Sequence, residues 1–103
     1  MNGYCEICGA PAEAEHHLVF GRGLRDIADR DRLKIKICNR CHNMGAVTER
    51  IHDNPMAEKL SKALGQAIWE RNFIAKQRGE DIEELVKEDA QNAFRDRYGR
   101  SYL

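Results

Sequence analysis

Residues 34–43 read Lys-Ile-Lys-Ile-Cys-Asn-Arg-Cys-His-Asn, and this short stretch decides the fold. Its first four residues alternate polar and apolar side chains, as a half-buried β-strand does. The next four place Cys38 and Cys41 with two residues between them, so that both thiolates can reach one metal ion from a tight turn. The stretch therefore predicts a strand over residues 34–37 that leads directly into a metal-binding turn.

A matching pair of cysteines lies near the N-terminus. Cys5 and Cys8 are again separated by two residues, and 29 residues lie between the two pairs. Two matched pairs supply the four thiolates of a tetrahedral zinc site, so we predict a structural Zn²⁺ held by Cys5, Cys8, Cys38 and Cys41. Disulfides are a weaker interpretation because they belong to exported proteins, and a thioredoxin-like redox pair is weaker because no βαβ pattern surrounds either pair.

The remaining chain divides near residue 53. Residues 17–20, which read His-Leu-Val-Phe, predict a second strand, and residues 21–32 are expected to form the loop between the strands. Asn54 as N-cap and Pro55 at the first helical position predict a helix over residues 55–78 that ends at Gly79. A second helix is expected over residues 81–98, which has an acidic start and is followed by Gly99.

Length and charge limit the classes of protein. The chain has 103 residues with 17 basic and 17 acidic side chains, which fits one domain and excludes nucleic-acid binding by bulk charge alone. No run approaches the roughly 20 apolar residues of a membrane span, and the N-terminus lacks the zones of a signal peptide. We therefore expect no membrane partner and a cytoplasmic location, where thiols stay reduced.

All four histidines lie in the first half of the chain, at positions 16, 17, 42 and 52. A lone histidine beside a zinc turn is more often a surface residue or a substitute for a cysteine ligand. Here the histidines cluster, and His42 directly follows the last cysteine. If the zinc draws residue 42 toward the strand that bears His16 and His17, a second, open metal site can form there.

These motifs together resemble one family. Cys-x-x-Cys, then Glu-His-His-Leu-Val-Phe-Gly at 15–21, Ile-Cys-x-x-Cys-His-Asn at 37–43 and Ile-His at 51–52 resemble the HNH nucleases, which are ββα-metal endonucleases. The likeness is nearest to small HNH proteins of phages and prophages with a four-cysteine zinc site. Those proteins also end in Phe-x-x-x-Tyr-Gly-x-x-Tyr-Leu, as residues 94–103 do.

The resemblance implies an α+β fold: a small zinc-stabilised ββα-metal (HNH) core at residues 1–53, followed by two C-terminal α-helices. The helical extension at 54–103 is expected to pack on the core as one compact domain. The implied activity is metal-dependent hydrolysis of DNA phosphodiesters that leaves a 5′-phosphate and a 3′-hydroxyl.

The resemblance also implies roles for individual residues. His16 would bind the catalytic metal, His17 would be the general base, and His42 would complete the metal site. The third ligand is left open between His52 and Asn43. One divalent ion is required, and Mg²⁺, Mn²⁺, Ni²⁺ and Zn²⁺ all remain candidates.

One family residue is missing from its usual place. The family carries an asparagine shortly before the second cysteine pair, where it orients the base or touches the metal, but residues 33–37 contain none. Asn43, or with less support Asn39, is the candidate for that role.

DNA binding is predicted from the densest basic stretch of the chain. Three aspartates interrupt this stretch, so a solvated loop with internal Asp–Arg pairs is the competing interpretation. Because the stretch joins the two predicted strands, we expect it to rim the catalytic site and to contact phosphates without reading sequence. Its members are Arg22, Arg25, Arg30, Arg32, Lys34, Lys36 and Arg40.

The sequence thus predicts a metal-dependent DNA endonuclease of the HNH type, of phage or prophage origin. The alternative is a non-catalytic zinc-binding module that binds nucleic acid or protein. A zinc deaminase is excluded, because its signature needs His-x-Glu and Pro-Cys-x-x-Cys. Trp69 lies next to the apolar position Ile68, where it could either widen the buried face of its helix or mediate a dimer contact. The sequence therefore leaves open whether the chain is a monomer or a homodimer.

Overall fold

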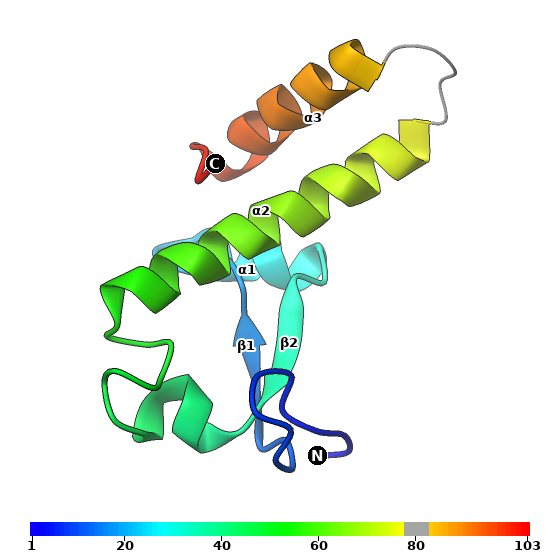
Figure 1. The fold of residues 1–103 in the computed structure, drawn as a ribbon. Helices are drawn as coiled ribbons and strands as arrows, with labels where there is room; N and C mark the ends of the chain where they lie inside the picture. The colour runs from blue at the N-terminus through cyan, green and yellow to red at the C-terminus, as the bar shows by residue number, and fades with distance from the viewer. Residues whose placement is uncertain (78–82) are drawn as a thin grey trace.

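The computed structural model describes residues 1–77 and 83–103. The protein is a small α+β molecule in which a two-stranded antiparallel sheet is joined to helices (Figure 1). The elements follow in the order β1 (Ala14–His17), α1 (Leu24–Arg30), β2 (Lys34–Ile37), a short helical turn (Arg40–Met44), α2 (Pro55–Gln77) and α3 (Glu83–Tyr98). None of the helices in the described ranges has both the length and the apolar character needed to cross a membrane.

The sheet consists of one hairpin-like pair. β1 and β2 run antiparallel, with Ala14 opposite Ile37 and His17 opposite Lys34. The predicted strand at 34–37 is confirmed, whereas the first strand ends where it was predicted to begin. The last backbone hydrogen bond between the two segments runs from Leu18 N to Leu33 O at 2.8 Å. Beyond it the chain leaves the sheet, and the side chains of Leu18 and Val19 are buried in the core.

The predicted loop at 21–32 is wrong over most of its length, because residues 24–30 form helix α1. Leu24, Ile27 and Ala28 are spaced so that they share one helical face, and that face packs on the core. The charged residues between them cover the solvent side. A helix of seven residues is too short for its apolar stripe to stand out among so many charges.

The predicted start of the long helix is confirmed in detail. The Asn54 side chain accepts a bond from the backbone N–H of Ala57 at 3.3 Å, and Pro55 is the first helical residue. The predicted stop at Gly79 lies outside the described residues, as do the first two residues predicted for the second helix. That helix ends as predicted, since Gly99 follows Tyr98 with φ 82° and donates to Arg95 O at 2.8 Å.

The described residues form two separate cores. The larger one lies where α1, α2 and α3 meet the chain after β1, and α2 crosses the molecule above it (Figure 1). Its buried members are Leu18, Val19, Ala28, Leu33, Phe94 and Tyr98. The smaller core combines three cysteines with two isoleucines: Cys5, Ile37, Cys38, Cys41 and Ile51.

Candidate functional site

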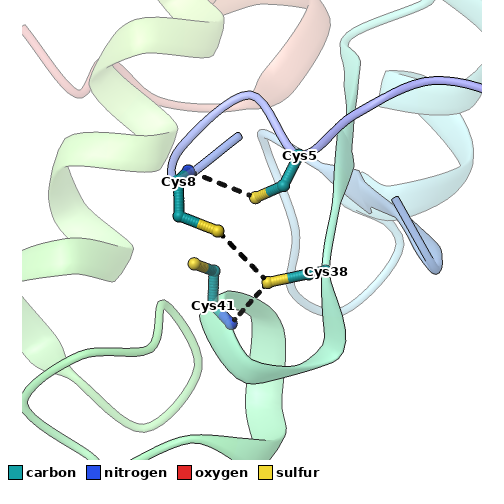
Figure 2. Close-up of side chains that lie close together, drawn as sticks. All are labelled: Cys5, Cys8, Cys38 and Cys41. Carbon is teal, nitrogen blue, oxygen red and sulfur yellow. Dashed lines mark hydrogen bonds between the residues drawn. The ribbon is translucent and has the colours of Figure 1, made fainter. Parts of the chain in front are cut away.

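The two cysteine pairs meet at one point. The sulfur atoms of Cys5, Cys8, Cys38 and Cys41 all lie within 4.8 Å of one another, and the Cys8 and Cys38 sulfurs are 3.6 Å apart (Figure 2). Four sulfurs at about 2.3 Å from a tetrahedral zinc ion are about 3.8 Å from each other. All four cysteines are free, and this group could hold a metal ion such as zinc.

In each tight turn a backbone amide points at one of these sulfurs. The backbone N–H of Ile7 points at the Cys5 sulfur at 3.4 Å, and that of Cys41 points at the Cys38 sulfur at 3.4 Å. Burial alone would raise the pKa of Cys5, but the amide hydrogen bonds outweigh it and lower the pKa to about 6. Burial and the neighbouring sulfurs raise the pKa of Cys41 to about 12. Four thiolates this close need a cation among them.

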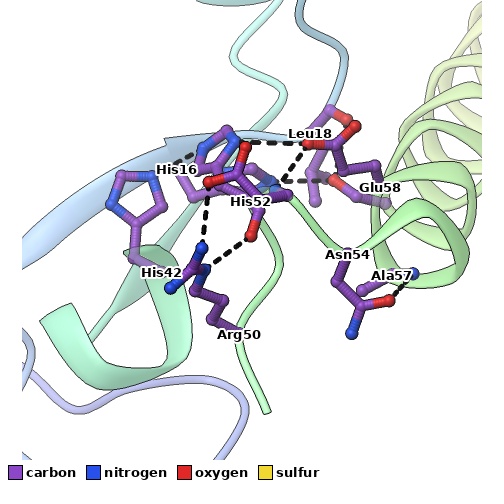
Figure 3. Close-up of polar contacts among 10 residues, drawn as sticks. His16, Leu18, His42, Arg50, His52, Asn54, Ala57 and Glu58 are labelled. Atoms are coloured by element: carbon purple, nitrogen blue, oxygen red, sulfur yellow. Dashed lines mark hydrogen bonds and ion pairs between the residues drawn. The ribbon is translucent and has the colours of Figure 1, made fainter. Parts of the chain in front are cut away.

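A second cluster is built from histidines. His16 on β1, His42 on the helical turn and His52 in the following loop bring their ring nitrogens within 4.8 Å of one another (Figure 3). The Nε2 atoms of His42 and His52 are 3.1 Å apart. Two nitrogens at about 2.1 Å from one ion lie about 3.0–3.4 Å apart in octahedral or tetrahedral geometry. The three imidazoles could therefore hold one metal ion.

Backbone hydrogen bonds bring His52 back beside His42, although ten residues separate them in the sequence. Ile51 N donates to Cys41 O at 2.8 Å, and His52 N donates to His42 O at 3.0 Å. Arg50 fastens the same loop, because its guanidinium donates to the carbonyls of His52 and Gly45 at 2.8 and 3.0 Å. The loop is thus held by the backbone carbonyls of Cys41 and His42, one residue from each cluster, which couples the two clusters.

His16 is held in one tautomer by its surroundings. Its ring is 1% exposed, and its Nε2 lies 2.8 Å from the hydroxyl of Ser61 on α2. The Ser61 hydroxyl donates its one proton to Leu18 O at 2.8 Å, so it must accept from His16 Nε2–H, and Nδ1 keeps its lone pair. Burial, followed by the positive charge that His52 and His42 would carry, lowers the pKa of His16 to about 3. The ring is therefore neutral at physiological pH, as a metal ligand must be.

His17 has a different partner. Its Nε2 lies 3.1 Å from Asp29 Oδ1, and Lys34 Nζ lies 3.1 Å from the same oxygen. Hydrogen bonding to Lys34, and then to His17, holds the pKa of Asp29 below its ordinary value. A carboxylate only accepts, so His17 donates from Nε2, and Nδ1 is the basic nitrogen of the neutral ring.

The histidines share one pocket of about 540 Å³. Asn43 also lines it, whereas Asn39 is turned toward Glu13, to which its side-chain amide donates at 3.4 Å. The complete lining is Glu15, His16, His17, Phe20, Gly21, Arg25, His42, Asn43 and His52. The residues predicted for the catalytic and catalytic-metal roles are thus brought together in one cavity: His16, His17, His42, Asn43 and His52.

The basic stretch is spread over several parts of the molecule. Arg25 lines the histidine pocket, while Arg30 and Arg32 line a second one. Lys34 contacts Asp29 as described above, and Arg40 pairs with Glu49 at 3.6 Å. Lys36 donates to Asn2 O at 2.8 Å, and Arg22 is exposed. The expectation that the whole stretch rims one site is therefore replaced by a distribution over several surfaces.

Three residues of the site were missed from sequence. Asp29 had been counted only as an acidic interruption of the basic stretch, and Ser61 and Arg50 had no motif around them. No local pattern marks Asp29 either, because it reaches His17 only through helix α1, in a segment that was expected to be a loop.

The fold and the two clusters define a class: a small α+β protein with a four-cysteine group that could hold a metal ion, beside a pocket lined by imidazoles. Comparison with protein-family models, with curated proteins and with solved structures found no match to this chain.

Proposed function

We propose that this protein is a metal-dependent DNA endonuclease of the HNH type, of phage or prophage origin. One observation carries the proposal: His17, oriented by a carboxylate, lines the same pocket as a cluster of three imidazoles that fits one metal ion. The sequence motifs around these residues add the resemblance to HNH nucleases.

His17 has the arrangement that a general base needs. Asp29 accepts the proton of Nε2, which fixes the ring and leaves Nδ1 to take a proton from water. Asp29 thereby performs the orienting task for which the family uses an asparagine. Lys34 keeps Asp29 ionised, so the His17 ring stays oriented throughout the neutral pH range.

The three other histidines supply the candidate ligands for a divalent ion, and the pocket-lining Asn43 is a further candidate. When bound, such an ion would polarise the phosphate and stabilise the departing 3′ oxygen. Imidazole ligands suit Zn²⁺, Ni²⁺ and Mn²⁺ in particular, and Mg²⁺ would rely on added water oxygens.

The DNA backbone would be held from α1. Arg25 lines the pocket, and its guanidinium would contact the phosphate at the reacting centre. The formal net charge of zero means that such local contacts, rather than bulk attraction, must position the duplex.

Plasmid nicking tests the proposal. Purified protein is incubated with supercoiled plasmid and Mg²⁺, Mn²⁺, Ni²⁺ or Zn²⁺, beside the variants His17→Ala, Asp29→Asn and Asp26→Asn. We expect metal-dependent nicking that falls by about 10²–10⁴-fold in His17→Ala, since a positioned base contributes that much. Asp29→Asn should lose less, and Asp26→Asn, at an exposed position of the same helix, should match the parent.

Two results would overturn the proposal. Nicking that survives loss of His17 would remove the assigned base. A folded, metal-loaded protein that binds DNA without cutting it would instead support the non-catalytic zinc-binding module.

A further inference from the structure

A second pocket lies away from the histidines, where the end of α1, the second half of α2 and the end of α3 come together. Its volume is about 940 Å³, which is the size of sites that hold small organic ligands. Two aromatic rings, Trp69 and Phe73, and four cationic side chains line it. The cations are Arg30, Arg32, Lys76 and Arg97.

Positive charge is in excess in this pocket, because Asp31 is the one carboxylate among the described residues that line it. Arg97 is engaged by Asp31, whose two oxygens accept from the guanidinium at 2.6 Å each. Within the described part of the chain, no carboxylate oxygen lies within 4.0 Å of Arg30 or Arg32. These two exposed guanidinium groups therefore present positive charge to whatever enters.

The aromatic wall is preformed. The rings of Trp69 and Phe73 are stacked, with centroids 5.5 Å apart and planes 18° from parallel. Trp69 is fixed further by the bond from its indole N–H to Asp31 Oδ2 at 3.0 Å. A ligand that stacks here would find an ordered surface and would lose little free energy in ordering it.

Arg32 occupies a costly position in the backbone. Its φ of 59° lies in the left-handed region, which residues with a β-carbon rarely adopt. In the turn between α1 and β2, glycine or asparagine would adopt this backbone conformation with less strain. Arg32 adds a charged side chain to the pocket, and its backbone is strained in doing so.

We propose that this pocket binds a nucleotide unit, with its base against Trp69 and Phe73 and its phosphate on Arg30 and Arg32. Cations alone would take any anion, and rings alone would take any flat apolar group. The combination selects a flat ring that carries a phosphate, because bases stack on aromatic side chains and guanidinium groups bind phosphate in a forked geometry.

The nucleotide unit has two possible sources. It can be a free mononucleotide, or it can be an unpaired nucleotide in a DNA strand. Arg25 in the histidine pocket and Arg30 in this pocket lie five residues apart on α1, a rise of about 8 Å with the two side chains about 140° apart, so a strand that contacts both must pass around α1. The second source rests on the proposed function, whereas the first does not.

Trp69 is the only tryptophan of the chain, so its fluorescence reports on this pocket directly. The probes are deoxyadenosine 5′-phosphate, deoxyadenosine, inorganic phosphate, and a short single-stranded oligonucleotide with its blunt duplex as comparison. We expect saturable quenching by the mononucleotide, with at least about tenfold weaker binding of deoxyadenosine and of phosphate. An oligonucleotide that binds more tightly than the mononucleotide assigns the strand as the source; otherwise the free nucleotide is assigned.

Variants locate the binding. Arg30→Gln with Arg32→Gln should weaken it at least about tenfold, and Phe73→Leu should weaken the nucleotide but not the phosphate. Lys59→Gln with Arg95→Gln removes the same charge at exposed positions elsewhere and should bind like the parent. Circular dichroism confirms that each variant is folded.

His17→Ala separates this inference from the proposed function, because it removes the assigned base without altering the second pocket. Its nucleotide binding should equal that of the parent even if nicking is lost or was never present. Absence of saturable quenching by nucleotide and oligonucleotide alike would overturn the inference. Unchanged binding in the double arginine variant would overturn it as well.

Discussion

At the scale of single residues, the hydroxyl of Ser61 governs how His16 can be used. That hydroxyl has one proton, and Leu18 O takes it, so the His16 ring must donate from Nε2. Partners that fix the tautomer of a metal-binding histidine commonly contribute 10–100-fold to metal affinity. Ser61 is thus a positioning residue for His16, although it contributes no ligand atom to the cluster.

We predict that Ser61→Ala lowers the affinity of the histidine cluster for Mn²⁺ or Ni²⁺ by about tenfold or more. Alanine suits a helix at this position, so α2 should remain intact, and the ring of His16 should lose its fixed orientation. Isothermal titration after the cysteine site is saturated with zinc measures the effect. Thr48→Ala, an exposed hydroxyl in the loop before His52, is the control, and equal affinity in Ser61→Ala would contradict the prediction.

Sequence could supply the ligands of the site but not their supports. The cysteine spacing and the histidine motifs are local patterns, so they can be recognised without a fold. Ser61 lies 45 residues from His16, and Asp29 lies 12 residues from His17 on a segment expected to be a loop. Such partners are chosen by packing between distant elements, which no local pattern records.

At the scale of elements, the strength of the pattern decided what could be predicted. α2 begins with a side-chain cap and β2 alternates strictly, so the start of α2 and both ends of β2 were predicted correctly. β1 was displaced by three residues because Leu18 and Val19 look like strand residues but serve the helical core. Apolar residues report burial more reliably than they report which element is buried.

α2 can cross the core closely because Gly65 lacks a side chain at the crossing. A β-carbon at this position would lie 2.7 Å from Val19 Cγ2 and 3.1 Å from Leu18 Cβ. Both neighbours are fully buried and have no room to withdraw. The glycine therefore fixes the distance between α2 and the chain that follows β1.

We predict that Gly65→Ala lowers the free energy of unfolding by up to about 2 kcal/mol. Alanine gains about 1 kcal/mol of helix propensity, but forced overpacking in a core costs about 1–3 kcal/mol. Urea denaturation of the zinc-loaded protein measures the difference. Ala67→Gly, exposed on the same helix, calibrates the propensity term, and a Gly65→Ala variant more stable than the parent would contradict the packing argument.

At the scale of the whole molecule, Asp31 connects three helices. Its carboxylate accepts from Trp69 on α2 and from Arg97 and Tyr98 on α3, while the residue itself directly follows α1. Burial alone would raise the pKa of Asp31, but these hydrogen bonds outweigh it and lower the pKa. The ionised Asp31 side chain thus links the end of α1 to α2 and α3.

We predict that Asp31→Asn lowers the free energy of unfolding by about 2–3 kcal/mol near pH 7, because Arg97 loses its charged partner. Since the pKa of Asp31 is lower in the folded state, its contribution is present above about pH 4 and is lost as the pH falls further. The difference between parent and variant in thermal melts should therefore shrink below about pH 4. Asp96→Asn, exposed on α3, should show neither effect, and a difference that persists unchanged at pH 3 would contradict the assignment.

The two cores predict how the molecule responds to loss of zinc. The smaller core is made of three cysteines and two isoleucines, so without a cation it retains little apolar surface and several mutually repelling sulfurs. The larger core contains no cysteine. We therefore expect a strong chelator to accelerate amide exchange by at least about 100-fold in residues 3–14 and 36–54, and to leave much of the protection at 18–33 and in α2.

Because the loop of His52 pairs with Cys41 and His42, the histidine cluster should disperse at the same time and stop binding Mn²⁺, although no cysteine belongs to it. Hydrogen exchange followed by mass spectrometry, with and without zinc reloading, measures both effects. Equal loss of protection along the whole chain would show one cooperative unit in place of two cores, and an unchanged pattern would show that the cysteine group does not depend on a metal.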